Sequence, residues 1–333
     1  MLATLWRTNR PLTFTGLAML AVLALTTAGL VLDPRQVTGA PVWLKPAKFA
    51  VSIAVYSFTL AWMFTFLDRW PKMRRTIGWV TAVTMAIEMV IIGGQAYRGT
   101  TSHFNASTPL DMALFSIMGT AIVAQTLSTI AVAIALWRTP FADRALGWAM
   151  RLGMAITIVG AFTGGLMTRP TDAQLAAARA GQGMTIAGAH TVGAPDGGAG
   201  LPGTGWSTGH GDLRVPHFLG LHALQALPIV ALLLGRRRIA DAVGARLVMV
   251  AAGSYVGLFA ILLTQALRGQ SVIAPDGTTL TMLAVWAAAT FAAAHSIQYR
   301  RSEGSKDQKT NFSFERAVQD DLTFGARSSA GSR

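Results

Sequence analysis

A segment of 22 residues that recurs within the chain constrains its fold more than any other feature. IIGGQAYRGTTSHFNASTPLDM begins at Ile91, and ILLTQALRGQSVIAPDGTTLTM begins at Ile261, 170 positions later and without a gap. Eight positions are identical, namely Ile91, Gln95, Ala96, Arg98, Gly99, Thr108, Leu110 and Met112. Such a recurrence indicates an internal duplication, and each copy follows a strongly apolar segment.

The composition indicates a protein that is embedded in lipid. Apolar residues make up 52% of the 333 residues, charged residues only 13%, and the mean hydropathy is +0.45. A helix needs about 20 apolar residues to cross about 30 Å of hydrocarbon. We therefore expect an all-α integral membrane protein with eight transmembrane helices. They fall at 11–32, 47–67, 76–98, 112–137, 147–168, 216–235, 246–267 and 279–299. The apolar run at 11–32 is too long for a signal peptide, so we expect it to be retained as the first helix.

The duplication predicts two four-helix repeats, residues 1–140 and 141–298. Outside the best window, LKPAKF from Leu44 parallels LRVPHF from Leu213. Because four crossings return the chain to the same side, the repeats are expected to be parallel and related by an axis along the membrane normal. The polar tail 299–333 is expected to be disordered.

The second repeat carries about 33 extra residues between its first two helices. Thr171 and Gln174 suggest a capping box for a short helix, and eleven glycines follow among residues 181–211. A flexible linker is one reading of this composition. Because apolar residues are interspersed, we expect 169–215 to form an ordered extracytoplasmic lid.

The distribution of cations predicts the orientation in the membrane. With the N-terminus inside, 20 of the 28 Lys and Arg fall on the cytoplasmic side, as the positive-inside rule requires. The sequence thus predicts a multi-pass protein of the bacterial cytoplasmic membrane with both termini in the cytoplasm. The net charge of +13 follows from this topology, so the lipid bilayer and not nucleic acid is the expected partner. The absence of cysteine excludes disulfides and thiolate metal sites within the chain.

Glu88 is the only acidic residue in the interior of a predicted span. Counted from Arg98, it lies about 15 Å deep, where an unpaired charge costs at least about 2.5 to 3.5 kcal/mol. Function and a satisfied interhelical hydrogen bond both remain open readings. Glu88 shares a helix face with Ile91, Ile92 and Gln95.

Two Gln/Arg pairs occupy equivalent places in the repeat. Gln95 with Arg98, and Gln265 with Arg268, come at the predicted outer ends of their helices. The two arginines could attract an anion as entrance charges, or they could anchor the helix ends at the lipid interface.

The histidines suggest a second class of function. Five of the six lie in the predicted outer half. His103, His217 and His222 are candidate metal ligands, with Asp212 as a candidate to orient them by hydrogen bonding. His217 and His222 are five residues apart, so they cannot both face one site, whereas His222 and Gln225 share a face. No His-x-x-x-His spacing is present. His222 and His295 differ by about 15 Å in depth, which argues against a pair of axial haem ligands.

The chain resembles a family of uncharacterised bacterial polytopic membrane proteins. The resemblance is carried by WLKPAKFAVS from Trp43, QAYRGTTSHFN from Gln95, HTVGAPDGGAGLP from His190 and DLRVPHFLGLHALQ from Asp212. It implies an eight-helix membrane topology and supplies no activity.

These observations lead to a functional hypothesis with alternatives from other classes. We expect an outward-facing polar cavity that binds a small solute or ion, with transport as an open alternative. The rival is a membrane enzyme that uses an extracytoplasmic metal or haem, and a sensory or scaffolding protein is a third reading. The candidate binding residues are Glu88, Gln95, Arg98, His103, Asn105, Asp212, Arg214, His217, His222, Gln225, Gln265 and Arg268.

Overall fold

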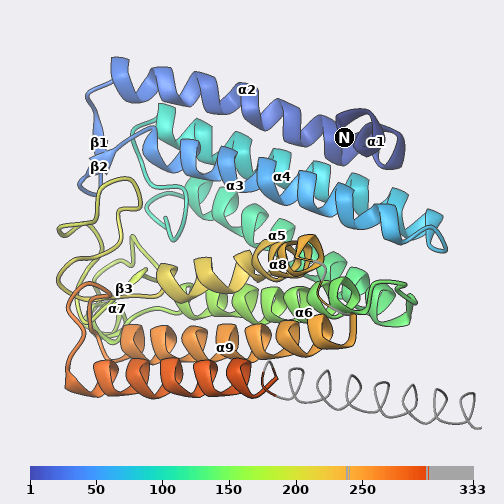
Figure 1. Cartoon of the computed structure of the whole chain (residues 1–333). Helices are drawn as coiled ribbons and strands as arrows, with labels where there is room; N and C mark the ends of the chain where they lie inside the picture. Colours follow the sequence, from blue (N-terminus) through green and yellow to red (C-terminus); the bar gives the residue numbers. More distant parts are fainter. Residues whose placement is uncertain (238, 240, 298, 300–333) are drawn as a thin grey trace, which may run out of the picture.

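The computed structural model describes residues 1–237, 239, 241–297 and 299, and it is helical apart from two short hairpins (Figure 1). Eight of the described helices are long and apolar enough to cross a membrane, as the sequence predicts. These helices are α2 (Arg10–Leu32), α3 (Leu44–Met63, continued by the 3-10 turn η1, Phe64–Phe66), α4 (Pro71–Tyr97), α5 (Pro109–Arg138), α6 (Arg144–Met167), α8 (Arg214–Arg236), α9 (Asp241–Leu267) and a last helix, Gly277–Ile297. Apart from Tyr299, the predicted disordered tail lies outside the described residues.

Several helices begin before the predicted span. Helix α4 starts at Pro71, not at 76, and α9 starts at Asp241, not at 246. A hydropathy window excludes the charged residues of a first turn, whereas the backbone needs only a suitable first residue, and proline is well suited to that place. The apolar stretch therefore gives the span and underestimates the length of the helix.

The helices form two groups, one of α2 to α5 and one of α6, α8, α9 and the last helix (Figure 1). Helix α2 packs on α3 and α4 in the first group, and α6 packs on α8 and α9 in the second. Helices α6 and α8 approach at two glycines: a Cβ added to Gly160 would come within 2.5 Å of the backbone of Gly220. Small residues allow this close approach, which gives helices in lipid their van der Waals contact.

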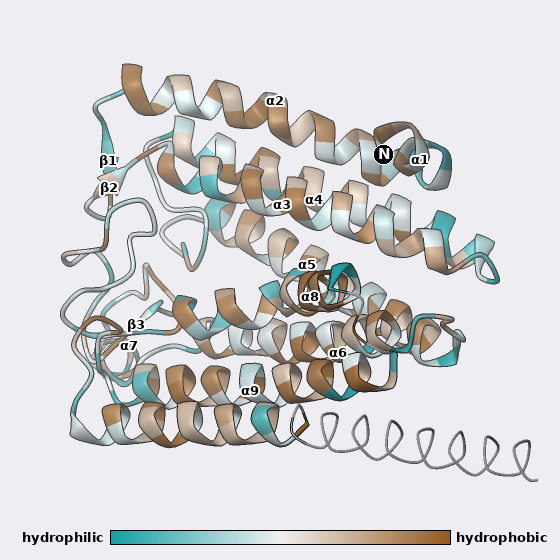
Figure 2. Ribbon diagram, viewed as in Figure 1, coloured by the Kyte–Doolittle hydropathy of each residue, from teal (hydrophilic) through white to brown (hydrophobic). Residues whose placement is uncertain are grey.

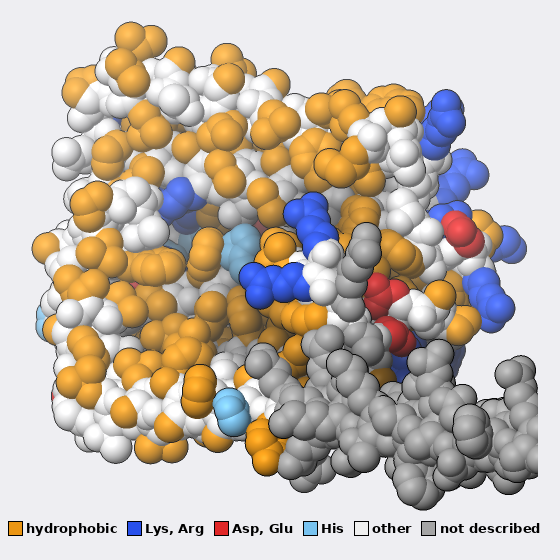
Figure 3. Space-filling model, viewed as in Figure 1, with side chains coloured by type: hydrophobic (Ala, Val, Ile, Leu, Met, Phe, Trp, Pro, Cys, Tyr) orange, Lys and Arg blue, Asp and Glu red, His pale blue; other side chains and the backbone are white. Residues whose placement is uncertain are grey.

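The two ends of the molecule differ in character. Lys and Arg side chains gather at the end that carries the N-terminus and the short α1 (Leu2–Thr8), which we call the arginine-rich end (Figure 3). The opposite end, called the loop-rich end, carries the connections 33–43, 98–108, 168–213 and 268–276 (Figure 1). Between the ends, the helices are largely apolar (Figure 2).

One apolar cluster, called the base cluster, joins the two groups. It includes Leu60 of α3, Phe64 of η1, Leu136 of α5, Met150 of α6 and Leu224 of α8, all fully buried. The other apolar clusters among the described residues are smaller, and two of them draw their buried residues from the first group alone. The groups therefore share most of their apolar packing in the base cluster.

The segment 169–215, called the lid, is folded over the loop-rich end. It begins with α7 (Asp172–Arg179), which has the predicted capping box between Thr171 and Gln174. The strands β3 (Thr191–Val192) and β4 (Gly211–Asp212) pair in antiparallel fashion, with Thr191 opposite Asp212. In the first group, β1 (Gln36–Val37) and β2 (Ala40–Pro41) form a smaller hairpin.

The lid contacts both groups of helices. Ala106 and Ala187 donate backbone hydrogen bonds that join the lid to the 98–108 connection, at 2.8 Å each. On the other side, Ser271 donates to the Ser207 carbonyl oxygen at 3.0 Å. The lid thus connects the two groups through hydrogen bonds.

The turns that end α4 and α9 have the same geometry. Gly99 has a φ of 71° and Gly269 a φ of 73°, a left-handed conformation that glycine adopts without strain. In both turns the residue after the glycine donates its N–H to the carbonyl of the glutamine, at 3.0 Å to Gln95 and 3.1 Å to Gln265. The repeated Gln-x-x-Arg-Gly spacing therefore ends both helices in the same way.

Candidate functional site

Glu88 is a buried carboxylate without a hydrogen-bond partner. Only 1% of the residue is exposed, and neither carboxylate oxygen has a partner within the described part of the chain. The satisfied interhelical hydrogen bond that the sequence left open is therefore not present. Ile91, Ile92 and Gln95 are buried as well, which confirms that they share the inward face of α4. The ammonium of Lys45 lies within electrostatic range of Glu88.

Two lysines of the first turns of α3 face the loop-rich end without an ion pair. Lys45 Nζ lies 3.0 Å from His103 Nδ1, and Lys48 Nζ donates to the Thr204 carbonyl oxygen of the lid at 2.7 Å. Both side chains are half-buried, and neither forms an ion pair with a described residue. Because lysine is only a donor, the contact assigns the acceptor role to His103 Nδ1 and leaves its proton on Nε2.

His190 of the lid is oriented by Asp196. The His190 Nδ1 lies 2.7 Å from Asp196 Oδ2, and Asp196 also accepts the backbone N–H groups of His190 and Thr191. Burial lowers the pKa of His190 in spite of this carboxylate. Although burial acts in the opposite direction, the bonds from His190 hold the pKa of Asp196 below its usual range.

Phe104 lies between His190 of the lid and His103 of the 98–108 connection. Its ring lies 4.9 Å from the ring of His190 and 6.1 Å from that of His103. Phe104 has a φ of 61°, a strained value for a residue with a side chain. Burial and the nearby ammonium of Lys45 hold the pKa of His103 well below its usual 6.5. His103 is therefore a neutral imidazole at physiological pH.

Arg214 is the third cation of this region. It pairs with the buried Asp212 at 2.5 Å, and its Nη2 also donates to the Gly205 carbonyl oxygen of the lid at 2.6 Å. Asp212 fixes the start of α8 by accepting the N–H of Arg214 at 2.9 Å. We call the half-buried group Lys45, Lys48, His103, His190, Arg214 and His217 the rim cluster.

His217 and His222 face different helices, as their spacing predicts. His217 Nδ1 lies 2.8 Å from the Gly160 carbonyl oxygen of α6, and its ring is within electrostatic range of His103. His222 contacts Gln225 at 3.3 Å, and Gln225 in turn donates to Thr59 of α3 at 3.3 Å. His217 therefore belongs to the rim cluster, whereas His222 and Gln225 lie deeper, between the two helix groups.

Arg98 and Arg268, proposed as entrance charges, are both neutralised by aspartates. Arg98 Nη1 lies 2.7 Å from the buried Asp111 Oδ1, which also accepts from Gln95 at 2.8 Å. Arg268 forms an ion pair with Asp276. Each arginine ties the end of one helix to the start of the next.

The remaining predicted residues have local structural roles. Gln265 donates to the Ser271 carbonyl oxygen at 2.8 Å. Asn105 donates to the Thr101 carbonyl oxygen at 3.0 Å and accepts the Ser107 N–H at 3.0 Å. Both side chains hold the connections in place, and none of these hydrogen bonds is to a residue of the rim cluster.

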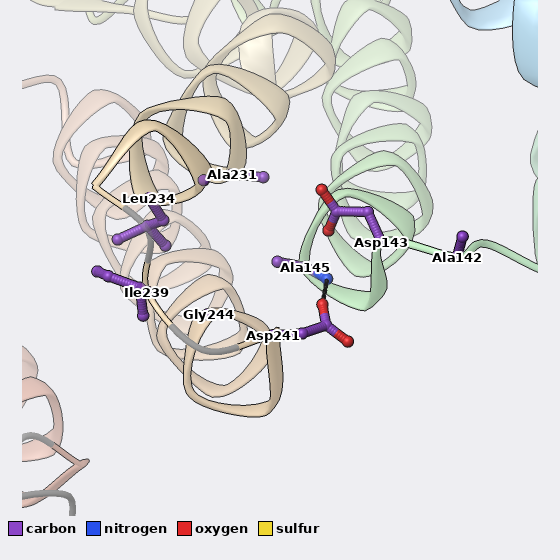
Figure 4. A pocket seen from close by; sticks show the side chains of 9 residues that line it. Ala142, Asp143, Ala145, Ala231, Leu234, Ile239, Asp241 and Gly244 are labelled. Carbon is purple, nitrogen blue, oxygen red and sulfur yellow. Dashed lines mark hydrogen bonds between the residues drawn. The ribbon is translucent and has the colours of Figure 1, made fainter.

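The described residues contain no group of three or more His, Asp or Glu side chains that could hold a metal ion. His103, His217 and His222 therefore do not meet as a three-histidine metal site. A cavity of about 340 Å³ lies at the arginine-rich end, between the start of α6 and the end of α8. Figure 4 shows Asp143 and Asp241 beside it, with Asp241 accepting the N–H of Ala145. This cavity is remote from the predicted site residues.

Sequence reasoning missed Lys45, Lys48 and the His190/Asp196 pair as site residues. A signal was available for the lysines, because Lys45 and Lys48 align with Arg214 and His217 in the duplication. Basic residues at equivalent positions of α3 and α8 indicate that the starts of the two helices contribute to the same region. No comparable signal identified the pairing of His190 with Asp196, which depends on a glycine-rich turn.

Comparison with protein-family models, with curated proteins and with solved structures gives no match. The resemblance to uncharacterised bacterial membrane proteins therefore stays a prediction from the sequence. The function of the chain has to be argued from the site.

Proposed function

We propose that the chain is a multi-pass membrane protein of the bacterial cytoplasmic membrane that binds a small solute at the loop-rich end and couples this binding to protonation of Glu88. The observation that carries the proposal is the Glu88 carboxylate, buried without a donor and within electrostatic range of Lys45. Ionisable groups inside membrane helices are expensive and usually mark a solute or proton pathway. Lys45 connects this group to His103 and so to the rim cluster.

The proposed orientation has the loop-rich end outside and the N-terminus in the cytoplasm. The gathering of Lys and Arg at the arginine-rich end supports it (Figure 3). Because the chain has no cysteine, a single Thr208→Cys variant, next to the exposed Gly209 and His210 of the lid, can report the topology in intact cells. A membrane-impermeant maleimide is expected to label Thr208→Cys and to spare Lys72→Cys. Labelling of Lys72→Cys alone would contradict the orientation.

The proposed architecture is two parallel four-helix repeats. The equal turns at Gly99 and Gly269 and the equivalent packing of α2 on α3 and of α6 on α8 support it. The repeats would place Lys45 and Arg214 symmetrically about the solute site. They differ at Glu88, which aligns with Leu258, so the proton-linked group belongs to the first repeat alone.

Glu88→Gln tests the proposed coupling. The purified full-length protein is screened by thermal unfolding against anionic, cationic and neutral small metabolites at pH 6 and pH 8. We expect at least one class to raise the midpoint, because a ligand that binds only the folded state stabilises it. The size of this effect should depend on pH in the wild type and lose that dependence in Glu88→Gln.

Asp68→Asn is the matched control, since the Asp68 side chain is 83% exposed at the arginine-rich end. It removes a carboxylate without touching the site and should leave the pH dependence intact. A folded Glu88→Gln protein with the full pH dependence of the wild type would overturn the coupling. A protein that no solute stabilises would overturn the binding function.

A further inference from the structure

Resting on this proposed function, we propose that the solute is a small anion with a carboxylate, phosphate or sulfate group, bound between Lys48 and Arg214 in place of two lid carbonyl oxygens. Lys48 comes from α3 and Arg214 from α8, so the site joins the two helix groups. The chemical class follows from the partners of the two cations in the closed structure.

The lid supplies neutral acceptors where an anion would be expected. Lys48 Nζ donates to the Thr204 carbonyl oxygen at 2.7 Å, and Arg214 Nη2 donates to the next carbonyl oxygen, that of Gly205, at 2.6 Å. These bonds already have an ionised donor, and an anionic acceptor would add a Coulomb attraction between full charges that a neutral carbonyl oxygen cannot supply. An anionic oxygen would therefore compete effectively for these donors.

Two of the three cations at the site lack an ion pair within the described part of the chain. At the loop-rich end, Arg35, Arg98 and Arg268 each have an aspartate partner. Lys45 and Lys48 have none among the described residues, and Lys45 lies within electrostatic range of Lys48 and Arg214. The buried Asp212 forms its ion pair with Arg214, and it also lies within electrostatic range of Lys48, as Asp196 does of Lys45. An incoming anion would offset the remaining like-charge repulsion.

The lid turn that contacts the cations is suited to move as a unit. Gly203 and Gly205 both have positive φ, at 75° and 67°, and no described backbone hydrogen bond joins residues 202–205 to either helix group. Its described hydrogen bonds to α3 and α8 are those from Lys48 and Arg214, and the ring of the next residue, Trp206, lies 5.7 Å from that of Phe218 of α8. Displacement of the two carbonyl oxygens by an anion would remove both hydrogen bonds and leave the turn held at Trp206.

Cysteine labelling can test this displacement directly. Thr204→Cys keeps the backbone carbonyl and introduces the only thiol of the chain. The full-length protein in a neutral detergent is titrated with sodium sulfate, sodium phosphate or sodium succinate, and the maleimide labelling rate and the unfolding midpoint are followed. Sodium chloride at equal ionic strength corrects for screening. We expect at least one of the three anions to accelerate labelling and to raise the midpoint.

Variants of the two cations show whether the anion uses this site. Lys48→Met and Arg214→Gln should each raise the Kd by about 10- to 100-fold, as expected for the loss of one charge-assisted bond. Lys48→Arg keeps the charge and should keep the response even if Lys48→Met folds poorly. Lys72→Met, at the arginine-rich end, is the matched control and should behave as the wild type.

Three results would overturn the inference. One is the absence of a response to all three anions, and another is an unchanged response in both Lys48→Met and Arg214→Gln. The third is faster labelling of Thr204→Cys that appears without added anion in nanodiscs with phosphatidylglycerol and is absent in phosphatidylcholine, because the occupant is then a lipid headgroup. If only cationic or neutral solutes bind, and their binding depends on pH through Glu88, the inference of an anionic solute is wrong while the proposed function stands.

Discussion

The two helix groups are joined by different kinds of contact at the two ends of the molecule. Towards the arginine-rich end, the base cluster brings fully buried residues of α3, α5, α6 and α8 into one apolar core. At the loop-rich end, the connections are hydrogen bonds through the lid, together with the small cluster around Phe104. Apolar packing resists separation, whereas bonds from cations to carbonyls can be exchanged for bonds to a ligand. On the proposed function, this difference predicts that the molecule opens at the loop-rich end and stays closed at the other.

The largest expected effect comes from breaking the base cluster. Leu136→Ala removes a side chain with 0% exposure from the part of α5 that contacts the second group. We expect a loss of about 2 to 5 kcal/mol in the free energy of unfolding, the usual cost of such a cavity. Leu127→Ala, at a position of the same helix that is 62% exposed, should cost much less when both are measured by chemical unfolding in detergent. Equal losses would contradict the importance of the base cluster.

A smaller effect is expected within the second group. Gly160→Ala places a Cβ within 2.5 Å of the Gly220 backbone, which has no side chain that can move aside. We expect a loss of about 3 kcal/mol in the free energy of unfolding, the upper part of the range for overpacking. Gly165→Ala is the control on the same helix, since its Cβ would meet no atom within 4 Å. A tolerated Gly160→Ala would show that α6 and α8 do not form a rigid pair.

The two equivalent turns should differ in their response to loss of the aspartate. Asp111 is buried and accepts from Gln95, Arg98 and Thr108, so Asp111→Asn should cost about 1.5 to 3 kcal/mol of unfolding free energy. Asp276 is 38% exposed in its ion pair with Arg268, and Asp276→Asn should cost about 1 kcal/mol or less. Thermal unfolding of the two variants side by side measures the difference. A larger loss for Asp276→Asn would reverse this ranking of the turns.

The smallest expected effect is a loss of stability in acid. The pKa values of His103 and His190 are lowered by folding, so the unfolded chain takes up protons first as the pH falls below 6.5. Stability therefore decreases as the pH falls from 6.5 towards the folded values. The lowered pKa of Asp196 stabilises the folded protein at pH values above the unfolded pKa of 3.8, and this stabilisation is lost only at lower pH.

Unfolding midpoints at pH 7.5 and 5.5 measure this acid effect. His103→Gln and His190→Gln should each reduce the difference between the two midpoints. His210→Gln, which alters an exposed lid residue, should leave the difference unchanged. The sign would be wrong if the wild type became more stable at pH 5.5. Burial sets this sign; among the charged neighbours, Lys45 and Arg214 act in the same direction, and Asp196 opposes it at His190.

The spans and the buried acid could be predicted because hydropathy and a lone Glu in an apolar run are local signals. The capping box of α7 is also local, and it is present as expected. The partners of the cations could not be read from the sequence. Arg98 meets Asp111 across a turn, and Lys48 meets a carbonyl 156 residues away. These contacts depend on the way in which the lid folds, which glycine content alone does not determine.

The most direct test measures distances between spin labels in the two helix groups, with and without anion. Labels at Tyr97→Cys and Leu267→Cys report on the loop-rich end, and labels at Trp79→Cys and Met249→Cys report nearer the arginine-rich end. All four positions are exposed. If saturating sulfate, phosphate or succinate lengthens the first distance and leaves the second unchanged, the account holds. Equal changes at both ends, or no change at the loop-rich end under any of the three anions, would contradict it.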